Sequence, residues 1–478
     1  MALRWAAFLL PLNIWGQSLY PNTYRELSSK ALSKQKDSLK KVLVCPTAFK
    51  EKETQKQFKE YWDNRTIYLS NAISANDFVQ QPSINSYLQK IVEDITGSNR
   101  KYFSAAPLLL INRSSSVNAF AYGSNIICVN LGLISFAESR EEIALVLAHE
   151  LAHNLLNHPE KSMREKAETI TSKEYKDNIN AILSSKYGRF SMLKKIIEGY
   201  VFNNARHNRY HEDEADSLAI ELLTNSKQIF RPEFFLRLDS ADLVYQTPLK
   251  NPTSSYFTAF NLPIDEAWFQ RKSKGLSSKK YSFSQGELSD SVKTHPECKK
   301  RFEASRNKAT GNGLPLTPVP AALKSQVNKM IIWNLFNNQA LTAAMYRLLL
   351  EKDKGNFDLW HQMMIAFVID GLHRSDLAMN RFNAIRIQSK EYIAANYYEL
   401  QNYFEQIPRE TLEESARKIF GQPFWSGSSN EDKAFKSLLA KLGSSDADDK
   451  KQFEKGRADY IKNYPEILYN EHLDIFNK

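Results

Sequence analysis

The stretch Glu141-Glu-Ile-Ala-Leu-Val-Leu-Ala-His149-Glu150-Leu-Ala-His153-Asn-Leu-Leu156 decides the fold of this chain. Its acidic start and recurring apolar residues predict a buried helix. Residues four apart lie on one face of a helix, so His149 and His153 can bind one metal ion together. Burying two imidazoles and the Glu150 carboxylate is unfavourable unless a cation pairs with them. The sequence therefore predicts a metal site, with Glu150 placed to take a proton from a metal-bound water.

A second motif downstream can complete this site. A catalytic zinc takes three protein ligands, and the run Arg209-Tyr-His-Glu212-Asp-Glu214-Ala-Asp216 can supply the third. On a helix Glu212 and Asp216 share a face, whereas Glu214 points away. Glu212 can then bind the metal while Asp216 accepts a hydrogen bond from a ligand histidine. The alternative for this acidic run is a solvated helix face.

Three short apolar runs upstream of the helix have the length of strands: Pro107–Ile111, Val117–Tyr122 and Ile126–Asn130. The last two flank Gly123-Ser-Asn125 and predict a hairpin. A sheet edge beside a zinc-binding helix can bind an extended peptide as an added strand. The residues expected along this substrate edge are Asn118, Ala119 and Phe120.

The length of 478 residues exceeds what one hydrophobic core usually holds, so at least two domains are expected. We predict an α+β fold that is mainly α, in which a zincin-like catalytic domain with a small β-sheet precedes an α-helical domain. The predicted boundaries are a signal peptide over 1–18, a peptidase domain over 19–322 and a helical domain over 323–478. A net charge of +10 leaves contact with anionic lipid or an acidic partner open, although a solvated basic face is favoured.

The first residues, Met1 to Ser18, place a short apolar run before small residues, which is typical of a secretory signal peptide. The alternative is a partly buried N-terminal helix. No later stretch is apolar enough to predict a transmembrane span, and no nucleic-acid motif is present. We therefore expect a periplasmic or secreted protein. Three cysteines exclude a disulfide framework, although one bridge between Cys45 and Cys128 is conceivable.

The C-terminal third is expected to form helices from about Leu323. Apolar segments start at Leu341, Leu359, Leu377 and Ala394, with breaks at Lys354-Gly355, Asp370-Gly371 and Gln388-Ser389. This spacing favours αα-hairpins of nearly tetratricopeptide length, with a plain helical bundle as the alternative. Two other segments are interpreted from composition: Leu156–Asn203 as a polar helical excursion and Pro248–Val292 as a long surface loop.

Four motifs occur in order: Val117-Asn-Ala-Phe-Ala121, His149-Glu-Leu-Ala-His153, Glu212-Asp-Glu-Ala-Asp216 and Thr294-His295-Pro296. Together they resemble the HtpX and CAAX-prenyl-protease family of zinc endopeptidases over about Leu88–Phe302. The resemblance implies one zinc ion held by His149, His153 and Glu212. It also implies that Glu150 is the general base and Asp216 a supporting carboxylate. The exported, soluble bacterial members join such a peptidase to helical repeats, which implies a role in envelope protein quality control.

His295 is a further catalytic candidate, because the following proline stiffens a loop that could reach the open position of the metal. There it could contact substrate, stabilise an oxyanion or block the metal. The other histidines near the motifs, His158, His207 and His211, are expected at surface or helix-capping positions.

These observations predict an exported zinc metalloendopeptidase that cleaves unfolded or misassembled proteins. Its expected partners are protein or peptide substrates and an envelope protein bound by the C-terminal helices. One alternative is a chaperone or scaffold whose helical repeats bind proteins while the protease site is vestigial or latent. An exopeptidase is the other alternative.

Overall fold

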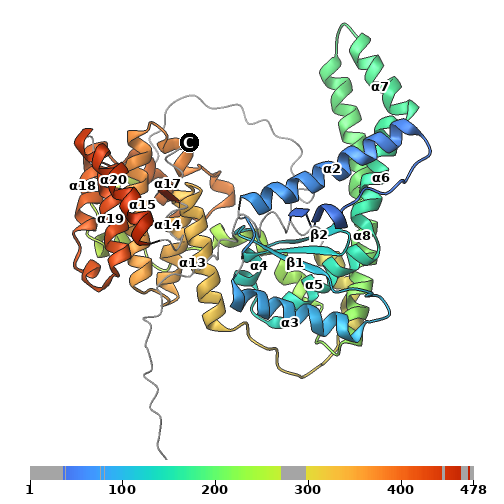
Figure 1. Cartoon of the computed structure of the whole chain (residues 1–478), viewed down its shortest axis with the longest axis horizontal. Coiled ribbons are helices and arrows are strands. Elements are labelled where there is room, and N and C mark those ends of the chain that lie inside the picture. Colours follow the sequence, from blue (N-terminus) through green and yellow to red (C-terminus); the bar gives the residue numbers. More distant parts are fainter. Residues whose placement is uncertain are drawn as a thin grey trace, which may run out of the picture.

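The computed structural model describes residues 36–37, 39–75, 77–79, 81–270, 298–443, 447–464 and 472–473. The predicted signal peptide and His295 lie outside these residues. Within them the protein is mainly helical and contains one three-stranded sheet, as the predicted fold class requires (Figure 1). A helix long and apolar enough to cross a membrane is not found in this described part.

The sheet contains β1 (Leu108–Asn112), β2 (Ala119–Gly123) and β3 (Ile126–Asn130). β3 is central; it pairs in parallel with β1 and antiparallel with β2, which confirms the predicted hairpin. The turn residues Ser124 and Asn125 both have positive φ (52° and 61°), as the tightest hairpin turns require. β2 is therefore an edge strand of this sheet.

Two long helices form the core beneath the sheet. α5 (Arg140–Leu155) is buried along almost its whole length, and the side chain of Ser139 caps it by accepting a hydrogen bond from the Glu142 N–H. α8 (Arg189–Asn225) packs along α5, where its small residues Ala215 and Ala219 are fully buried. Shorter elements complete this part: α3 (Pro82–Ser98), α4 (Leu131–Phe136), α9 (Glu233–Leu238), η1 (Ala241–Gln246), α12 (Cys298–Ser305) and η3 (Arg306–Lys308).

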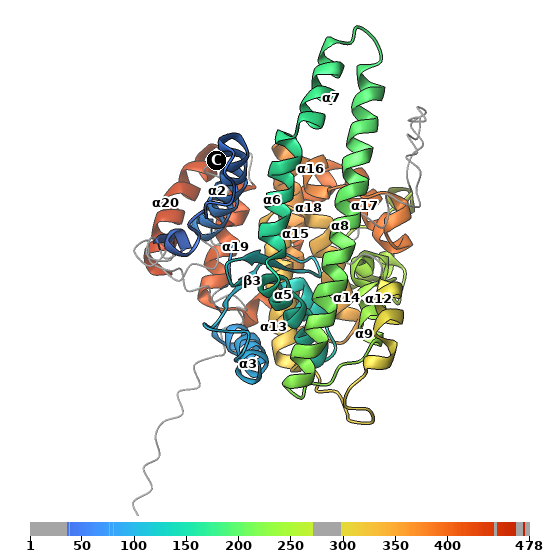
Figure 2. The same ribbon diagram turned by 90° about the vertical axis from the view of Figure 1, so that its right-hand side faces the viewer.

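An arm of helices projects from this part of the molecule. It consists of α6 (His158–Thr171), α7 (Lys173–Ser184) and the first half of α8, and both views show it extending beyond the body (Figures 1 and 2). α2 (Lys52–Ser74) lies along α6, with a hydrogen bond of 2.9 Å between the Thr54 and Thr171 hydroxyls. The predicted helical excursion is confirmed.

The C-terminal part is a stack of helices with its own core of aromatic and aliphatic side chains. Its elements are α13 (Ala321–Asn337), α14 (Leu341–Asp353), α15 (Leu359–Leu377), α16 (Arg381–Ile385), η4 (Lys390–Tyr392), α17 (Ala395–Gln406), α18 (Arg409–Phe420), η5 (Pro423–Gly427), α19 (Asn430–Leu442) and α20 (Ala447–Asn463). α13 joins the two parts, because Val327 and Met330 belong to the core of the sheet-bearing part while Trp333 and Phe336 belong to the C-terminal core.

The interpretation of Pro248–Val292 as a surface loop is wrong for its described residues. These include α10 (Thr253–Ala259) and η2 (Glu266–Phe269), which pack into the C-terminal core. Phe257 stacks on Tyr403 with ring centroids 4.4 Å apart. The composition suggested a loop because the apolar residues follow no regular period, and their packing partners are distant in sequence.

The predicted break at Asp370-Gly371 is also wrong, because α15 runs through it. A Cβ on Gly371 would lie 3.2 Å from the Phe336 ring, so the glycine permits close helix packing instead of ending the helix. Asp370 is buried and accepts a hydrogen bond of 2.7 Å from Arg374. The helix expected to start at Leu377 is absent, since that residue ends α15. Finally, Cys45, Cys128 and Cys298 are all free thiols, so the conceivable bridge is not formed.

Candidate metal centre

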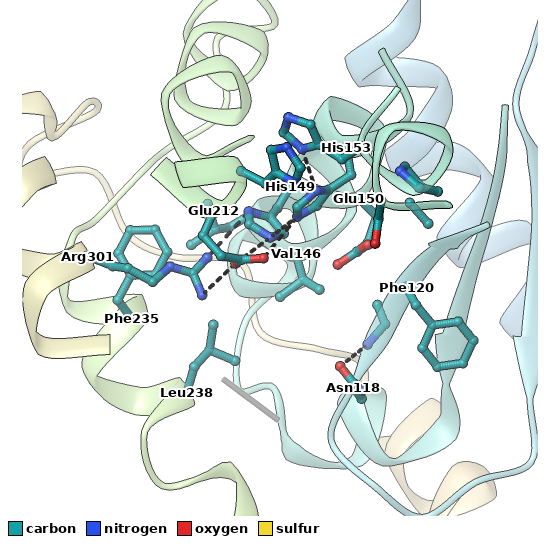
Figure 3. A pocket seen from close by; sticks show the side chains of 17 residues that line it. Asn118, Phe120, Val146, His149, Glu150, His153, Glu212, Phe235, Leu238 and Arg301 are labelled. Atoms are coloured by element: carbon teal, nitrogen blue, oxygen red, sulfur yellow. Dashed lines mark hydrogen bonds and ion pairs between the residues drawn. The ribbon is translucent and has the colours of Figure 1, made fainter. Parts of the chain in front are cut away.

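Three side chains converge on one point between α5 and α8. The Nε2 atoms of His149 and His153, one turn apart on α5, lie 2.9 Å from each other. Glu212 on α8 places Oε2 at 3.2 Å from the His149 Nε2 and Oε1 at 3.3 Å from the His153 Nε2. Figure 3 shows these groups facing one another at the wall of a cleft. They form a group able to hold a metal ion.

The spacing of these three donors fits zinc. A tetrahedral zinc ion with ligand bonds of about 2.0–2.1 Å holds its donor atoms about 3.3 Å apart. The observed separations of 2.9, 3.2 and 3.3 Å therefore require only small movements to accept the ion. Two imidazoles and one carboxylate are also a common ligand set of catalytic zinc.

The electrostatics of the site favour a cation. Burial alone would lower the pKa of His149, but Glu212 and Asp216 outweigh it and raise the pKa to about 10. Burial would likewise raise the pKa of Glu212, but the two histidines and Arg301 hold it well below its ordinary value. Both carboxylates are thus ionised and create a negative potential at the histidines, as a metal site requires.

Asp216 and Arg301 support His149 from behind. The Nδ1 of His149 lies 2.9 Å from Oδ1 of Asp216, so the carboxylate can accept a hydrogen bond from Nδ1–H, and Nε2 is then free to bind a metal. Arg301 on α12 donates to both Asp216 oxygens, at 2.7 and 2.6 Å, and its guanidinium lies over the Phe235 ring at 4.5 Å. Arg301 was not predictable from the sequence, because the residues of α12 have the pattern of an ordinary charged helix.

His158 supports the second histidine. Its Nδ1 lies 2.8 Å from the Nδ1 of His153, and its Nε2 lies 3.2 Å from Oε2 of Glu214. Since His153 presents Nε2 to the metal position, its Nδ1 carries the proton and donates to His158 Nδ1. His158 then carries its own proton on Nε2 and donates to Glu214. Burial and the neighbouring His153 hold the pKa of His158 below its ordinary value, which agrees with this neutral form.

The expectation that His158 and His211 occupy surface or capping positions is therefore wrong. Both are buried, and their rings stack with centroids 4.2 Å apart. The side chain of His207 lies outside the described residues. Glu214 does point away from the metal position, as helix geometry predicts, and it reaches His158 instead.

Glu150 lies in a cleft of about 340 Å³ beside the three converging side chains. Its carboxylate points into this cleft, between the histidines and β2 (Figure 3). Burial raises the pKa of Glu150, although both histidines act against this shift. A carboxylate with a raised pKa next to a metal position can accept and return a proton.

The opposite wall of the cleft is the edge strand β2. Asn118, Ala119 and Phe120 all line the cleft. The hydrogen bond from the Asn130 N–H to the Asn118 carbonyl shows that Asn118 faces β3, so the backbone of Ala119 and Ala121 faces the open side. The Asn118 side chain already accepts a hydrogen bond from the Ala119 N–H.

Residues 82–309 match peptidase family M48. A protein of Vibrio cholerae serotype O1, named beta-barrel assembly-enhancing protease, is 25% identical over 164 residues, which are 34% of this chain and 34% of that protein. This chain thus aligns with about a third of the length of that curated relative. The matched region contains all the described residues of the centre, and the family match confirms the resemblance drawn from the motifs.

Proposed function

We propose that this protein is a zinc-dependent endopeptidase, because its residues 82–309 match peptidase family M48. One observation carries the proposal: three donors with zinc spacing, His149, His153 and Glu212, lie in one cleft with the Glu150 carboxylate and an open strand edge. A bound zinc ion would act as a Lewis acid that polarises the peptide carbonyl and lowers the pKa of a water molecule.

Residues of the chain carry out the proton transfers and orient the histidines. Glu150 takes a proton from the attacking water and returns it to the leaving amine nitrogen. Burial raises the pKa of Glu150, so the carboxyl group can hold that proton between the two steps. Asp216 and His158 fix the tautomers of the two ligand histidines, so both Nε2 lone pairs face the metal.

The endopeptidase part of the proposal rests on β2. An extended peptide can bind as an added strand along the outward-facing backbone of Ala119 and Ala121, where the Ala119 N–H exchanges its bond to the Asn118 side chain for one to the peptide. This carries the scissile bond past Glu150. Backbone pairing is independent of substrate sequence, so unfolded segments of many proteins are suitable substrates. A folded protein would not present such a strand.

The biological setting is a further part of this proposal. A cleaved signal peptide over residues 1–18 would place the enzyme in the periplasm or outside the cell. There, cleavage of misassembled proteins would contribute to envelope quality control, with the C-terminal helices binding a partner. The name of the Vibrio cholerae relative, which refers to beta-barrel assembly, supports this setting.

The test is to map the products of an unfolded protein. The purified chain is stripped with a chelator, reloaded with zinc and incubated with reduced, unfolded casein. An endopeptidase should give internal fragments from the first time points, whereas an exopeptidase would shorten the substrate from one end. Fragments that appear without zinc, or only terminal trimming, would contradict the proposal.

A further inference from the structure

Large apolar side chains are exposed at the tip of the projecting arm. This tip, residues 183–193, contains the end of α7, a turn and the start of α8. The exposed fractions are 64% for Leu183, 78% for Tyr187, 80% for Phe190 and 40% for Leu193. Among the described residues no aromatic side chains are more exposed than Tyr187 and Phe190.

The tip has a defined conformation that presents these side chains. Gly188 has a φ of 72°, which residues other than glycine rarely adopt, and it allows α8 to start directly after the turn. Arg189 donates to the carbonyls of Leu183 and Ser185, at 3.0 and 2.6 Å, and so satisfies the end of α7. These bonds fix the backbone of the turn, on which the apolar side chains are exposed.

The charge around the tip has one sign. From Leu183 to Leu193 the sequence contains two basic residues, Lys186 and Arg189, and no acidic residue. The ammonium group of Lys186 lies 5.7 Å from the centre of the Tyr187 ring, so positive charge adjoins the apolar surface directly.

We propose that the arm tip inserts into the surface of a bilayer that contains anionic lipids. Exposed Tyr, Phe and Leu side chains suit the boundary between headgroups and acyl chains, and adjacent Lys and Arg side chains bind anionic headgroups. The absence of acidic residues over this stretch favours a lipid surface over a protein partner, whose rim usually carries both signs of charge. Binding is peripheral, because the tip consists of one turn and two helix ends.

The proposal has a consequence for the metal centre, and this consequence rests on the proposed function. The single helix α8 carries both the tip and Glu212. Glu212 follows Phe190 by 22 positions, which correspond to about 33 Å of helix. A tip anchored in a bilayer would hold the cleft at about this distance from the membrane surface, where unfolded segments of membrane proteins are within reach.

The test measures lipid binding without any peptidase assay. The full chain is mixed with vesicles of phosphatidylcholine, with or without phosphatidylglycerol, and the bound fraction is measured by flotation. The tip variant is Tyr187→Ser/Phe190→Ser. Its matched control is Phe382→Ser/Tyr392→Ser, which removes two aromatic side chains that are 69% and 64% exposed on the C-terminal part.

We expect the unmodified chain and the control variant to bind vesicles that contain phosphatidylglycerol, and to bind phosphatidylcholine alone much more weakly. The tip variant should lose about tenfold or more in partitioning, because two large apolar side chains no longer insert. Lys186→Glu should weaken binding while leaving the apolar residues in place. No flotation of the unmodified chain, equal binding to both vesicle types or full binding by the tip variant would overturn the proposal, whether or not the chain cleaves casein.

Discussion

The Nδ1 atoms of His153 and His158 lie 2.8 Å apart, so one imidazole has to donate a hydrogen bond to the other. The Nε2 of His153 lies beside His149 and Glu212, which leaves Nδ1 as its protonated atom. His158 is thus the acceptor, and its Nε2–H donates a hydrogen bond to Glu214. His153 is thus oriented by a neutral imidazole, whereas His149 is oriented by a carboxylate.

This relationship predicts that His158→Phe weakens zinc binding. Phenylalanine keeps a ring that can stack on His211 but cannot accept a hydrogen bond from His153. We expect the zinc dissociation constant to rise by about 10- to 100-fold, as loss of such a supporting partner typically causes. Competition with a chromophoric chelator measures it. An unchanged constant in a normally folded variant would show that His158 only packs.

Arg301 is predicted to stabilise the chain even without metal. Its side chain and that of Asp216 are buried and joined by two hydrogen bonds. Arg301→Leu removes both guanidinium hydrogen bonds from the buried Asp216 carboxylate, which then keeps only its contact with His149, and should cost about 3–5 kcal/mol. Arg301→Lys keeps the positive charge but cannot form the same pair of hydrogen bonds, so its loss of stability should be smaller than that of Arg301→Leu.

Denaturant unfolding of chelator-treated protein measures this effect. Arg409→Ala is the control, because Arg409 pairs with Asp376 at the surface and should change stability little. If Arg301→Leu and Arg409→Ala had the same stability, the buried pair would not stabilise the fold.

Glu212 and Glu214, two residues apart on α8, are predicted to differ in metal binding. Glu212→Ala removes a donor that lies 3.2 and 3.3 Å from the two histidine Nε2 atoms and should release zinc. Glu214→Ala removes only the carboxylate that His158 contacts on its far side from His153, so this variant should retain most of the metal. Metal analysis after gel filtration tests both, and the opposite ranking would move the ligand to Glu214.

Asp358 is predicted to make the stability of the C-terminal part depend on acid pH. Its carboxylate caps α15 by accepting from the His361 N–H, and it pairs with Lys329. Burial would raise the pKa of Asp358, but His361 and Lys329 outweigh it and lower the pKa. An unfolded aspartate titrates near about pH 3.9, so the stabilisation is complete above that pH and is lost as the pH falls through the folded pKa.

Asp358→Ala should therefore destabilise the protein by about 1 kcal/mol at neutral pH. The difference between the two melting temperatures should shrink below about pH 4, because Asp358 of the unfolded chain takes up a proton there while the folded carboxylate keeps its charge. A difference that stayed constant down to pH 2 would show that the charge of Asp358 does not contribute.

The sequence predicted the centre well where its residues follow one helical period. His149 and His153 are four apart on α5, and Glu212 and Asp216 are four apart on α8, so each pair could be placed on a face before the helices were seen. The hairpin of β2 and β3 was predictable for a similar reason, since a tight turn separates two alternating strands. These are local signals.

The sequence could not predict contacts between elements that are far apart in the chain. Arg301 reaches Asp216 across 85 residues, and nothing in its own helix marks it as buried. His158 looked like a capping residue because its partners are the side chains of His153 and Glu214. The glycine at position 371 suggested a helix break, although it serves to admit the Phe336 ring. In each case a tertiary contact overrides the local preference.

The central claim is that Glu150 transfers the proton at a zinc site whose ligands do not include it. The most direct measurement compares zinc content and casein cleavage in the unmodified chain and the Glu150→Gln variant, purified together. The account predicts one zinc ion per chain in both proteins, with cleavage by the unmodified chain alone. Cleavage by Glu150→Gln at the unmodified rate, or an unmodified chain that takes up no zinc, would contradict it.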